Sequence, residues 1–484
     1  MDDIAWLGTP AGQQALAEAS GLPDTEAPGA VARMRARYGQ RAAAILTQAS
    51  LRRAARVKFG AAAERWFYTR AGLEQATRPA VAAHRAATYV AAGATRVLDL
   101  GCGIGTDAWA FLDAGLEVVA VEIDPVTAAV AAANLAPAVA AGRARVLQGD
   151  VTVRLDELWS PGVSVFADPA RRTGAGRTWN PADFTPPWDW AVGLLARATA
   201  GGGVGCLKLG PGLPYRMIPE DVAAEWVSHR GDLVEVALWA LPAAYAADRP
   251  ASAPPGPSVP SGPSGPSGQG EVVTSTLPVA GTRTATLLDD GGAVLRLVAE
   301  DAPGPLRAPA VGSVLWEPDP AVIRAGAVDR LAELLDAGRV ADEIAYLVSA
   351  AAPGAGPGAG RSDPAGSVGE RSDPVGSAGS RLDPAGPAGR HPDPTRFATG
   401  FRVLEVLAAK EKVLRAWVRD HRVGRLEIKK RGVDTDPAAL RRRLRPSGPN
   451  AATLVLTPTP DGARALVVER LVVERPAAPR VAGP

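Results

Sequence analysis

Residues 96–105 of this chain are Arg96-Val97-Leu98-Asp99-Leu100-Gly101-Cys102-Gly103-Ile104-Gly105. A short apolar strand ends in an acid and runs into three glycines at alternate positions, and residues 107–114 then follow a helical pattern. Glycine has no Cβ, so it tolerates positive φ and lets the backbone come close to a ligand. The stretch therefore predicts a strand, a cofactor-binding loop and a helix, with Asp99 placed to accept a hydrogen bond from a cationic amine.

The residues that follow this loop alternate between strand and helix patterns. We expect strands at 116–121, 144–147 and 163–167, and a helix at 125–135. Strands that alternate with helices form a parallel sheet with helices on both faces. The sequence therefore predicts an α/β fold for this part of the chain.

Two further acids follow the next two strands. Glu122 lies about twenty residues beyond the glycine loop, at a strand end where a carboxylate can bind both ribose hydroxyls. Asp124 is the alternative for that role, and we favour Glu122 because it falls at the end of the strand. The third strand is followed by Asp150 and Val151.

The glycine spacing, together with the acid before it, resembles the class I S-adenosylmethionine-dependent methyltransferases. A nucleotide dehydrogenase would leave two residues before the last glycine, whereas here one residue separates each pair. The resemblance implies a Rossmann-like sheet and S-adenosylmethionine as cofactor, with Asp150 holding the adenine amino group and Val151 beside the ring. The expected cofactor residues around the loop are Asp99, Gly101, Gly103, Gly105, Glu122, Asp150 and Val151. A nicotinamide cofactor, or no ligand, is the alternative.

The fourth strand is followed by Asp168-Pro169-Ala170-Arg171-Arg172. Enzymes that methylate amino groups have Asn or Asp, two prolines and an aromatic residue here, and the resemblance makes Asp168 and Pro169 catalytic candidates. Asp168 would orient the target nitrogen toward the methyl donor, so that catalysis is mainly alignment. Arg171, a third catalytic candidate, replaces the aromatic and could stack on a base or bind a phosphate. Arg172 is a candidate substrate-binding residue. The alternative is a strand-end turn whose arginines form surface ion pairs.

Residues 67–79, which end in Gln75-Ala76-Thr77-Arg78-Pro79, precede a predicted helix that starts at Pro79. This segment resembles the one before the cofactor loop in the RNA cap guanine-N2 methyltransferases. The resemblance implies that Gln75 and Thr77 line the methionine end of the cofactor site. The alternative is that Thr77 merely caps the helix.

Near the C-terminus, residues 424–434 and 440–444 are basic and resemble the THUMP-like domain found in a bacterial family of class I methyltransferases. That family has the same Asp-Pro-Ala-Arg-Arg motif, and THUMP domains bind RNA in tRNA-modifying enzymes. Lys429, Lys430 and Arg431 are the candidate phosphate-binding residues. A solvated charged face is the alternative.

The domain organisation follows from changes in composition. We expect an N-terminal helical region (1–92), a methyltransferase domain (93–249), a Pro/Gly/Ser linker (250–270), a small α+β region (271–350), a low-complexity insertion (351–395) and a THUMP-like domain (396–475). Within them we expect strands at 272–277, 284–288 and 294–298, helices at 320–335 and 403–419, and strands at 425–429, 453–456 and 465–468. Asp290-Gly291-Gly292 predicts a hairpin turn.

Charge is unevenly distributed although the 484-residue chain carries a net charge of only +2. Residues 31–85 hold 12 Lys and Arg against two Glu, and residues 396–445 hold 15 against six acids, which favours a polyanionic partner. Cys102 and Cys206 lack metal-site spacing, and two cysteines fit a reducing cytoplasm. We expect no membrane span, no signal peptide and no metal.

The sequence therefore predicts a methyltransferase that modifies a nitrogen on RNA, with RNA as partner. Lys208, near the fifth strand, is a further candidate to face the substrate. A methyltransferase acting on a protein or a small molecule is the first alternative, since the aromatic after Asp168-Pro169 is missing. A non-catalytic RNA-binding protein that retains the cofactor site is the second.

Overall fold

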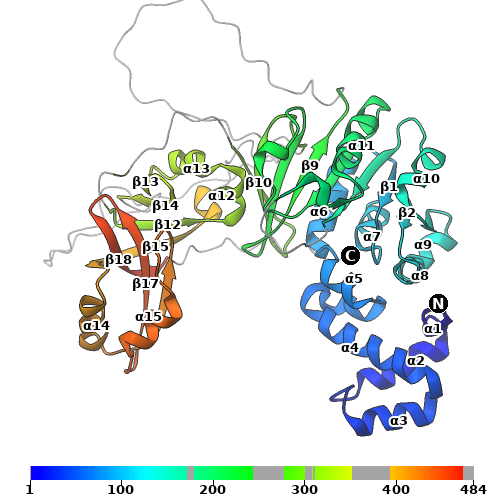
Figure 1. Cartoon of the computed structure of the whole chain (residues 1–484), viewed down its shortest axis with the longest axis horizontal. Helices are drawn as coiled ribbons and strands as arrows, with labels where there is room; N and C mark the ends of the chain where they lie inside the picture. Colours follow the sequence, from blue (N-terminus) through cyan, green and yellow to red (C-terminus); the bar gives the residue numbers. More distant parts are fainter. Residues whose placement is uncertain are drawn as a thin grey trace, which may run out of the picture. The chain divides into compact units, whose positions relative to one another are not determined.

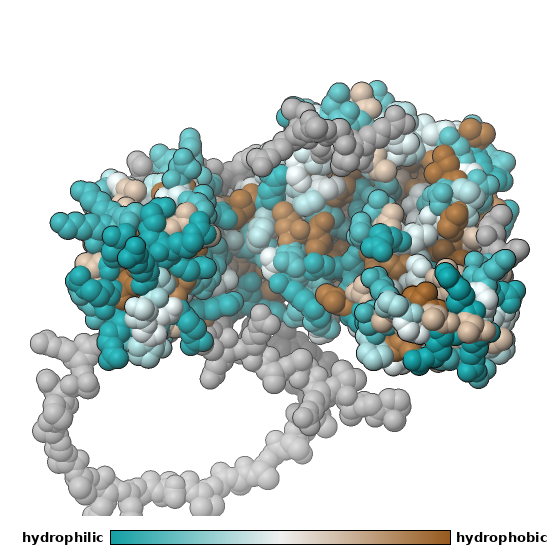
Figure 2. All heavy atoms as spheres, turned by 60° about the horizontal axis from the view of Figure 1, so that its bottom comes forward, coloured by the Kyte–Doolittle hydropathy of each residue, from teal (hydrophilic) through white to brown (hydrophobic). Residues whose placement is uncertain are grey.

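The structure is a computed structural model that describes residues 2–171, 179–243, 277–299, 308, 311–350 and 393–471. The chain forms two compact units that divide after Ala299 (Figure 1). On the face drawn in Figure 2, hydrophilic side chains cover much of the described surface and apolar ones form separate patches. Within the described ranges, every helix is too short or too polar to cross a membrane.

The first unit is built on a nine-stranded sheet in the order β11-β10-β8-β9-β7-β4-β1-β2-β3. Its strands are β1 (Arg96–Leu100), β2 (Glu117–Glu122), β3 (Ala144–Gln148), β4 (Ser164–Ala167), β7 (Gly205–Leu209), β8 (Ala223–His229), β9 (Asp232–Ala240), β10 (Arg283–Leu288) and β11 (Val294–Ala299). Strands β3, β2, β1, β4 and β7 are parallel neighbours, and β9 joins β7 antiparallel. The predicted α/β fold is confirmed, and the ends of β1, β2 and β4 meet at one edge, where such sheets bind ligands.

Helices pack on this sheet and bury a core of aromatic residues. They are α6 (Pro79–Ala91), α7 (Thr106–Asp113), α8 (Pro125–Asn134), α9 (Ala136–Ala140), α10 (Val151–Leu158) and α11 (Trp188–Ala200). Tyr89 contacts the rings of Phe111 and Trp239, and Phe111 contacts Phe166. These rings join α6 and α7 to strands β4 and β9, so burial of large apolar side chains positions the helices that flank the cofactor loop.

The N-terminal part of the first unit is helical, as predicted. Its helices are α1 (Asp2–Leu7), α2 (Pro10–Ser20), α3 (Pro28–Tyr38), α4 (Ala42–Phe59) and α5 (Arg70–Gln75). They surround a separate apolar core that includes Leu16, Ile45 and Phe59. Short 3₁₀ helices lie at Gly39–Arg41, Gly60–Arg65, Pro181–Asp183, Tyr215–Met217 and Pro394–Phe397. A two-stranded sheet pairs β5 (Ala170–Arg171) with β6 (Phe184–Thr185).

The second unit is built on a seven-stranded sheet in the order β13-β14-β12-β15-β18-β17-β16. Its strands are β12 (Val314–Pro318), β13 (Gly338–Ala341), β14 (Ile344–Ser349), β15 (Ala398–Ala408), β16 (Val423–Lys430), β17 (Asn450–Thr459) and β18 (Gly462–Arg470). Its helices are α12 (Pro320–Ala325), α13 (Val328–Leu334), α14 (Glu411–Asp420) and α15 (Pro437–Leu444). Leucines of α14 and α15 pack with Leu426 and Ile428 of β16 to form one core of this unit.

Three sequence expectations need correction. The helix expected at 403–419 is wrong over its first residues, because Val403 to Ala408 belong to β15 and pair with β18. The helix expected at 320–335 is broken at Gly326, whose φ of 77° ends α12. The region 271–350 is divided, since β10 and β11 extend the first sheet while β12 to β14 belong to the second.

The hairpin expected at Asp290-Gly291-Gly292 is confirmed by the antiparallel pairing of β10 with β11. The strands expected at 284–288, 294–298, 425–429, 453–456 and 465–468 lie within β10, β11, β16, β17 and β18. Residues 272–276 of another expected strand, and most of the two low-complexity tracts, lie outside the described residues.

Glu225 of β8 is a buried carboxylate that joins several elements of the first unit. His84 Nε2 lies 2.9 Å from its Oε1, Thr286 Oγ1 donates to Oε1 at 2.6 Å, and Trp239 Nε1 donates to Oε2 at 3.0 Å. Burial alone would raise the pKa of Glu225, but the neighbouring His84 and Arg296 charges and the Thr286 hydrogen bond hold it well below its usual range.

Replacing Glu225 by alanine should lower the free energy of unfolding by about 3–5 kcal/mol, because the buried donors around it lose their acceptor. The contribution of the carboxylate is present above the usual glutamate pKa and is lost as the pH falls through the lowered pKa of the folded state. Urea denaturation at several pH values measures both effects. Glu117→Ala is the control, since its ion pair with Arg96 is half exposed and should contribute less than about 1 kcal/mol. Equal losses in the two variants would contradict the role assigned to Glu225.

Candidate active site

A cavity of about 740 Å³ lies where β1, β2 and β4 end. It brings together residues from four separate parts of the first unit: the segment before α6, the glycine loop, the ends of β2 and β3, and the residues after β4. The predicted site residues that line it are Gln75, Thr77, Asp99, Gly101, Gly103, Glu122, Asp150, Val151 and Asp168.

The glycine loop is held in backbone conformations that L side chains rarely adopt. Gly101, Gly103 and Gly105 have φ values of 93°, 56° and 88°. A Cβ on Gly103 would meet nothing within 4 Å, so this position is open toward the cavity. Gly105 does not line the cavity; it precedes the first residue of α7 and faces Leu135. Gly101 and Gly103 therefore provide close approach to a ligand, whereas Gly105 shapes the turn into the helix.

Asp99 at the end of β1 is fully buried, and neither of its carboxylate oxygens has a hydrogen-bond partner within the described part of the chain. Burial, followed by the nearby Asp107 carboxylate, raises the pKa of Asp99 well above its usual range. A buried carboxylate without a donor is costly, so this site fits a ligand that brings a cationic donor into the cavity. The ammonium group of S-adenosylmethionine has this chemistry.

The end of β2 is connected to the glycine loop by Glu122. Gly103 N donates to Glu122 Oε2 at 3.0 Å, and Asp124 N donates to Oε1 at 2.9 Å. These two bonds fix the carboxylate at the cavity wall, and each oxygen retains a lone pair for a ligand hydroxyl. Asp124 instead caps α8, because its Oδ1 accepts from Thr127 N at 2.8 Å. This geometry favours Glu122 over Asp124 for the ribose.

Asp150 and Val151 stand at the start of α10. Asp150 Oδ1 accepts from Thr152 N at 2.8 Å and from Thr152 Oγ1 at 2.7 Å, so Asp150 is the N-cap of this helix. Its Oδ2 accepts no hydrogen bond from the described residues and remains available to an exocyclic amine. Val151 is buried beside it and offers an apolar surface.

Gln75 and Thr77 line the opposite wall, on the segment between α5 and α6. Thr77 Oγ1 donates to Asp107 Oδ2 at 2.5 Å, whereas α6 has no side-chain cap, so Thr77 does not serve as a helix cap. Lys58 Nζ supports the segment by donating to the carbonyl oxygens of Leu73, Glu74 and Ala76 at 2.8, 3.0 and 2.6 Å. Burial, with the nearby Lys208 and Arg78 charges, lowers the pKa of Lys58 to about 8.

Sequence reasoning did not single out a buried ionic group behind the cavity. Arg85 of α6 is 1% exposed, and its guanidinium pairs with Asp107 of α7 and Glu235 of β9. Asp107 lies in the first turn of α7, directly after the glycine loop, where a helix begins beside a bound ligand. This position is the sequence signal that could have identified Asp107. Arg85 and Glu235 are far apart in sequence and gave no such signal.

Asp168 lies at the mouth of the cavity and forms an ion pair with Lys208 of β7, through Oδ2. Burial opposes the charge on Lys208, but the carboxylates of Asp168, Asp107 and Glu235 outweigh it and raise the pKa of Lys208. Lys208 therefore stays protonated and holds one carboxylate oxygen, which leaves Asp168 Oδ1 for a substrate. Pro169 is buried and does not line the cavity.

The remaining wall comes from a part of the chain that sequence reasoning missed. Thr185, Pro186 and Pro187 line the cavity on the side of Asp168 and Ala170. Pairing of β5 with β6 brings them there, with Ala170 opposite Thr185. Arg171 is a backbone partner of Phe184 in this small sheet, and Arg172 lies outside the described residues.

The three candidate residues of β16 and its C-terminal end belong to the second unit. Lys429 Nζ pairs with Glu317 Oε2 at 2.7 Å and lies over the ring of Phe401. Arg431 lies over the ring of Tyr346, 5.3 Å from its centre, and Lys430 is exposed. Two of the three therefore have partners within this unit. Among the described residues, no cluster of His, Cys, Asp and Glu has an arrangement that could hold a metal ion.

Comparisons with known proteins identify the family and the fold of this chain. The chain is 30% identical over 88% of its length, and over 95% of theirs, to uncharacterized S-adenosylmethionine-dependent methyltransferases from two Mycobacterium tuberculosis strains, CDC 1551 and H37Rv. A crystal structure assigned as a methyltransferase from Porphyromonas gingivalis W83 has the same fold, with 19% identity, a TM-score of 0.59 and coverage of 89% of this chain and 90% of that one. Residues 398–470 match the "THUMP domain-like" family, and residues 1–55 match a domain of unknown function, DUF8688.

Replacing Asp99 by asparagine should weaken binding of S-adenosylmethionine by about 10- to 100-fold, because a charge-assisted hydrogen bond to the ligand ammonium is lost. Isothermal titration calorimetry measures this change. Asp113→Asn, an exposed carboxylate at the end of α7, is the matched control and should bind as the unchanged protein does. Full affinity in the Asp99 variant would remove this residue from the cofactor site.

Binding should also depend on pH through Asp99. Since the pKa of Asp99 is raised in the free protein and the ligand ammonium favours the ionised carboxylate, binding should release a proton and weaken as the pH falls through that pKa. Calorimetry in buffers of different ionisation enthalpy measures the protons released. The Asp99→Asn variant should release fewer, and identical release from both proteins would argue against this coupling.

Proposed function

Because the chain belongs to the S-adenosylmethionine-dependent methyltransferases, we propose that it transfers the methyl group to a nitrogen of a base in RNA. The observation that carries the proposal is the Asp168–Lys208 pair at the mouth of the cofactor cavity. S-adenosylmethionine, when bound, supplies an activated methyl group. The remaining chemistry is alignment of the acceptor nitrogen, which the side chains of this wall perform.

Asp168 has one oxygen free to accept a hydrogen bond from an exocyclic amine. Such a bond orients the nitrogen lone pair toward the methyl group and stabilises the positive charge that develops on the nitrogen. Pro186 and Pro187 add a rigid apolar wall beside this acceptor. The combination of a carboxylate and a flat apolar wall suits a planar heteroaromatic amine better than a flexible chain.

Lys208 argues against an aliphatic amine as the substrate. An aliphatic amine is protonated at neutral pH, so the Lys208 ammonium beside Asp168 would repel it. The exocyclic amine of a nucleobase is neutral and has an adjacent ring atom that can accept a hydrogen bond from a protonated lysine. The pair therefore supports a base over a lysine side chain.

The THUMP-like family match and the basic composition of residues 398–470 support RNA as the carrier of that base. This segment holds 16 Lys and Arg against eight Asp and Glu, which corresponds to a net charge of +8. Such an excess favours a polyanion. We place the enzyme in the cytoplasm, where Cys102 and Cys206, both buried free thiols, would stay reduced.

Replacing Asp168 by alanine should lower methyl transfer to RNA by roughly 100-fold or more, since the acceptor that aligns the amine is lost. The assay is transfer of a tritiated methyl group from S-adenosylmethionine to total RNA, followed by mass spectrometry of the nucleosides. Asp168→Asn keeps an acceptor and should retain part of the activity. Asp183→Ala, a partly exposed carboxylate before β6 that does not line the cavity, is the control.

Two outcomes of the assay would contradict the proposal. Equal label on RNA from the unchanged protein and from the alanine variant would remove Asp168 from the mechanism. Label that enters only protein or small molecules would reject RNA as the substrate, and cofactor binding without label in any fraction would indicate a binding protein.

A further inference from the structure

Strands β17 and β18 separate at one end of the second unit. They pair from Thr453 with Val468 to Thr459 with Gly462, and their register stops there. Beyond that point, Asn450 to Ala452 pair with β16, and Glu469 and Arg470 pair with β15. The two strands therefore follow different neighbours, and a groove of about 1040 Å³ opens between them.

Part of the lining of this groove is apolar and comes from both strands. Ala451 and Ala452 of β17 and Val467 and Val468 of β18 belong to it. All of the lining residues fall between Leu404 and Arg470, within the segment that matches the THUMP-like family. The groove is therefore a feature of this domain alone and is distinct from the cofactor cavity.

One rim of the groove carries a stacked aromatic pair. The rings of Trp417 and His421 lie 4.3 Å apart with an angle of 21° between their planes. Glu405 fixes them, because Trp417 Nε1 donates to Oε2 at 3.0 Å and His421 Nε2 lies 3.6 Å from Oε1. The His421 side chain is 49% exposed, so this pair offers a preformed platform on which a planar group can stack.

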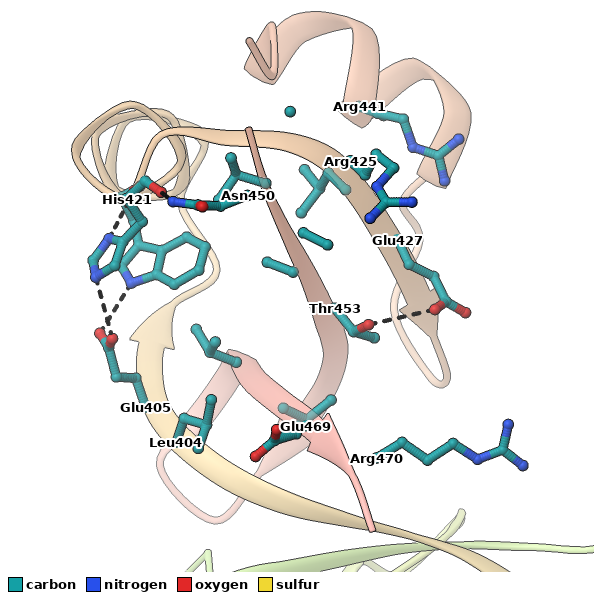
Figure 3. Close-up of a pocket in the computed structure, with 18 residues that line it drawn as sticks. Leu404, Glu405, His421, Arg425, Glu427, Arg441, Asn450, Thr453, Glu469 and Arg470 are labelled. Atoms are coloured by element: carbon teal, nitrogen blue, oxygen red, sulfur yellow. Dashed lines mark hydrogen bonds and ion pairs between the residues drawn. The ribbon is translucent and has the colours of Figure 1, made fainter. Parts of the chain in front are cut away.

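The other rim carries three arginines: Arg425, Arg441 and Arg470 (Figure 3). None of the three forms an ion pair or a side-chain hydrogen bond with any residue that the structure describes, although other arginines of the domain do. The figure shows them along one side and His421 and Glu405 along the other. Guanidinium groups without an internal partner are available to bind phosphates.

The groove also contains three carboxylates, which equal its arginines in number. Glu405 is occupied by the aromatic pair, and Glu427 accepts from Thr453 Oγ1 at 3.4 Å. Glu469 is the one groove carboxylate left without a donor among the described residues. None of these carboxylates forms an ion pair with a groove arginine among the described residues, so the three guanidinium groups keep their donors available for phosphates.

We propose that this groove binds single-stranded RNA, with a base stacked on His421 and phosphates along Arg425, Arg441 and Arg470. The inference rests on the proposed function and deepens it by locating where the RNA is held. A duplex cannot present an unpaired base to the platform, so the groove should prefer single strands. It also places the RNA contacts away from Lys429 and Arg431, which already have partners in the unit.

The test compares two triple variants of the full chain that remove the same charge. The groove variant is Arg425→Gln, Arg441→Gln and Arg470→Gln. The control variant is Lys410→Gln, Lys412→Gln and Arg464→Gln, whose side chains lie in the same domain but do not line the groove. Fluorescence anisotropy of a labelled 12-nucleotide RNA, single-stranded or annealed to its complement, measures binding at several salt concentrations.

The groove variant should bind the single strand roughly 30- to 100-fold more weakly than the unchanged protein. Its salt dependence should be shallower by about 2 logarithmic units per tenfold change in salt, as expected for three lost phosphate contacts on a single strand. The control variant should retain most of the affinity. His421→Leu should weaken single-strand binding without changing the salt dependence, since it removes stacking and no fixed positive charge.

The outcomes separate this inference from the proposed function. Unchanged single-strand binding by the groove variant, or equal losses in both triple variants, would overturn the groove while RNA methylation stands. Failure of the unchanged protein to bind any RNA would overturn both. Circular dichroism confirms that each variant is folded, and an extended peptide that binds the groove in place of RNA would also overturn the proposal.

Discussion

The hydrogen bond from Gly103 N to the Glu122 carboxylate connects the two strand ends on which the active site depends. It fixes the middle of a loop whose three glycines all have positive φ, and it fixes at the same time the acid expected to hold the ribose. Asp99, two positions before Gly101, is buried and lines the same cavity. A side chain at Gly101 or Gly103 would strain this turn. The backbone conformation of the loop and the position of the Glu122 carboxylate therefore depend on each other.

The second constraint is a surplus of buried negative charge. Asp99, Asp107 and Glu235 are each less than 7% exposed, and within the described part of the chain Arg85 is the one cation that pairs directly with two of them. Burying carboxylates without enough cations is unfavourable in the free protein. The same surplus stabilises a ligand that carries a sulfonium and an ammonium group, and it would favour that ligand over the neutral thioether product. The electrostatics that make the empty site costly are therefore those that bind the methyl donor.

The sequence predicted the first unit well where local pattern and chemistry coincide. Residues 96–105 specify strand, turn and helix through the nearest neighbours in the chain, so the loop, Glu122 and Asp168 could be identified before the fold was known. Glu235 and the wall at Thr185 to Pro187 could not, because pairing between distant segments brings them to the site. The helix predicted over residues 403–408 is wrong for a related reason. The local pattern of these residues fits helix or strand, and pairing with the distant strand β18 makes them a strand.

Charge in the second unit shows the limit of counting residues. The basic run at Lys429 to Arg431 was the strongest sequence signal for phosphate binding, yet Lys429 is neutralised by Glu317 and Arg431 lies over Tyr346. Arg415 and Arg443 both pair with Glu411. A basic side chain binds an external anion well only when the fold leaves it without an internal partner, because a paired guanidinium must first give up that contact. Arg425, Arg441 and Arg470 of the groove have no ion-pair partner among the described residues, so pairing within the folded domain, and not the density of charge in the sequence, indicates which cations remain available to a polyanion.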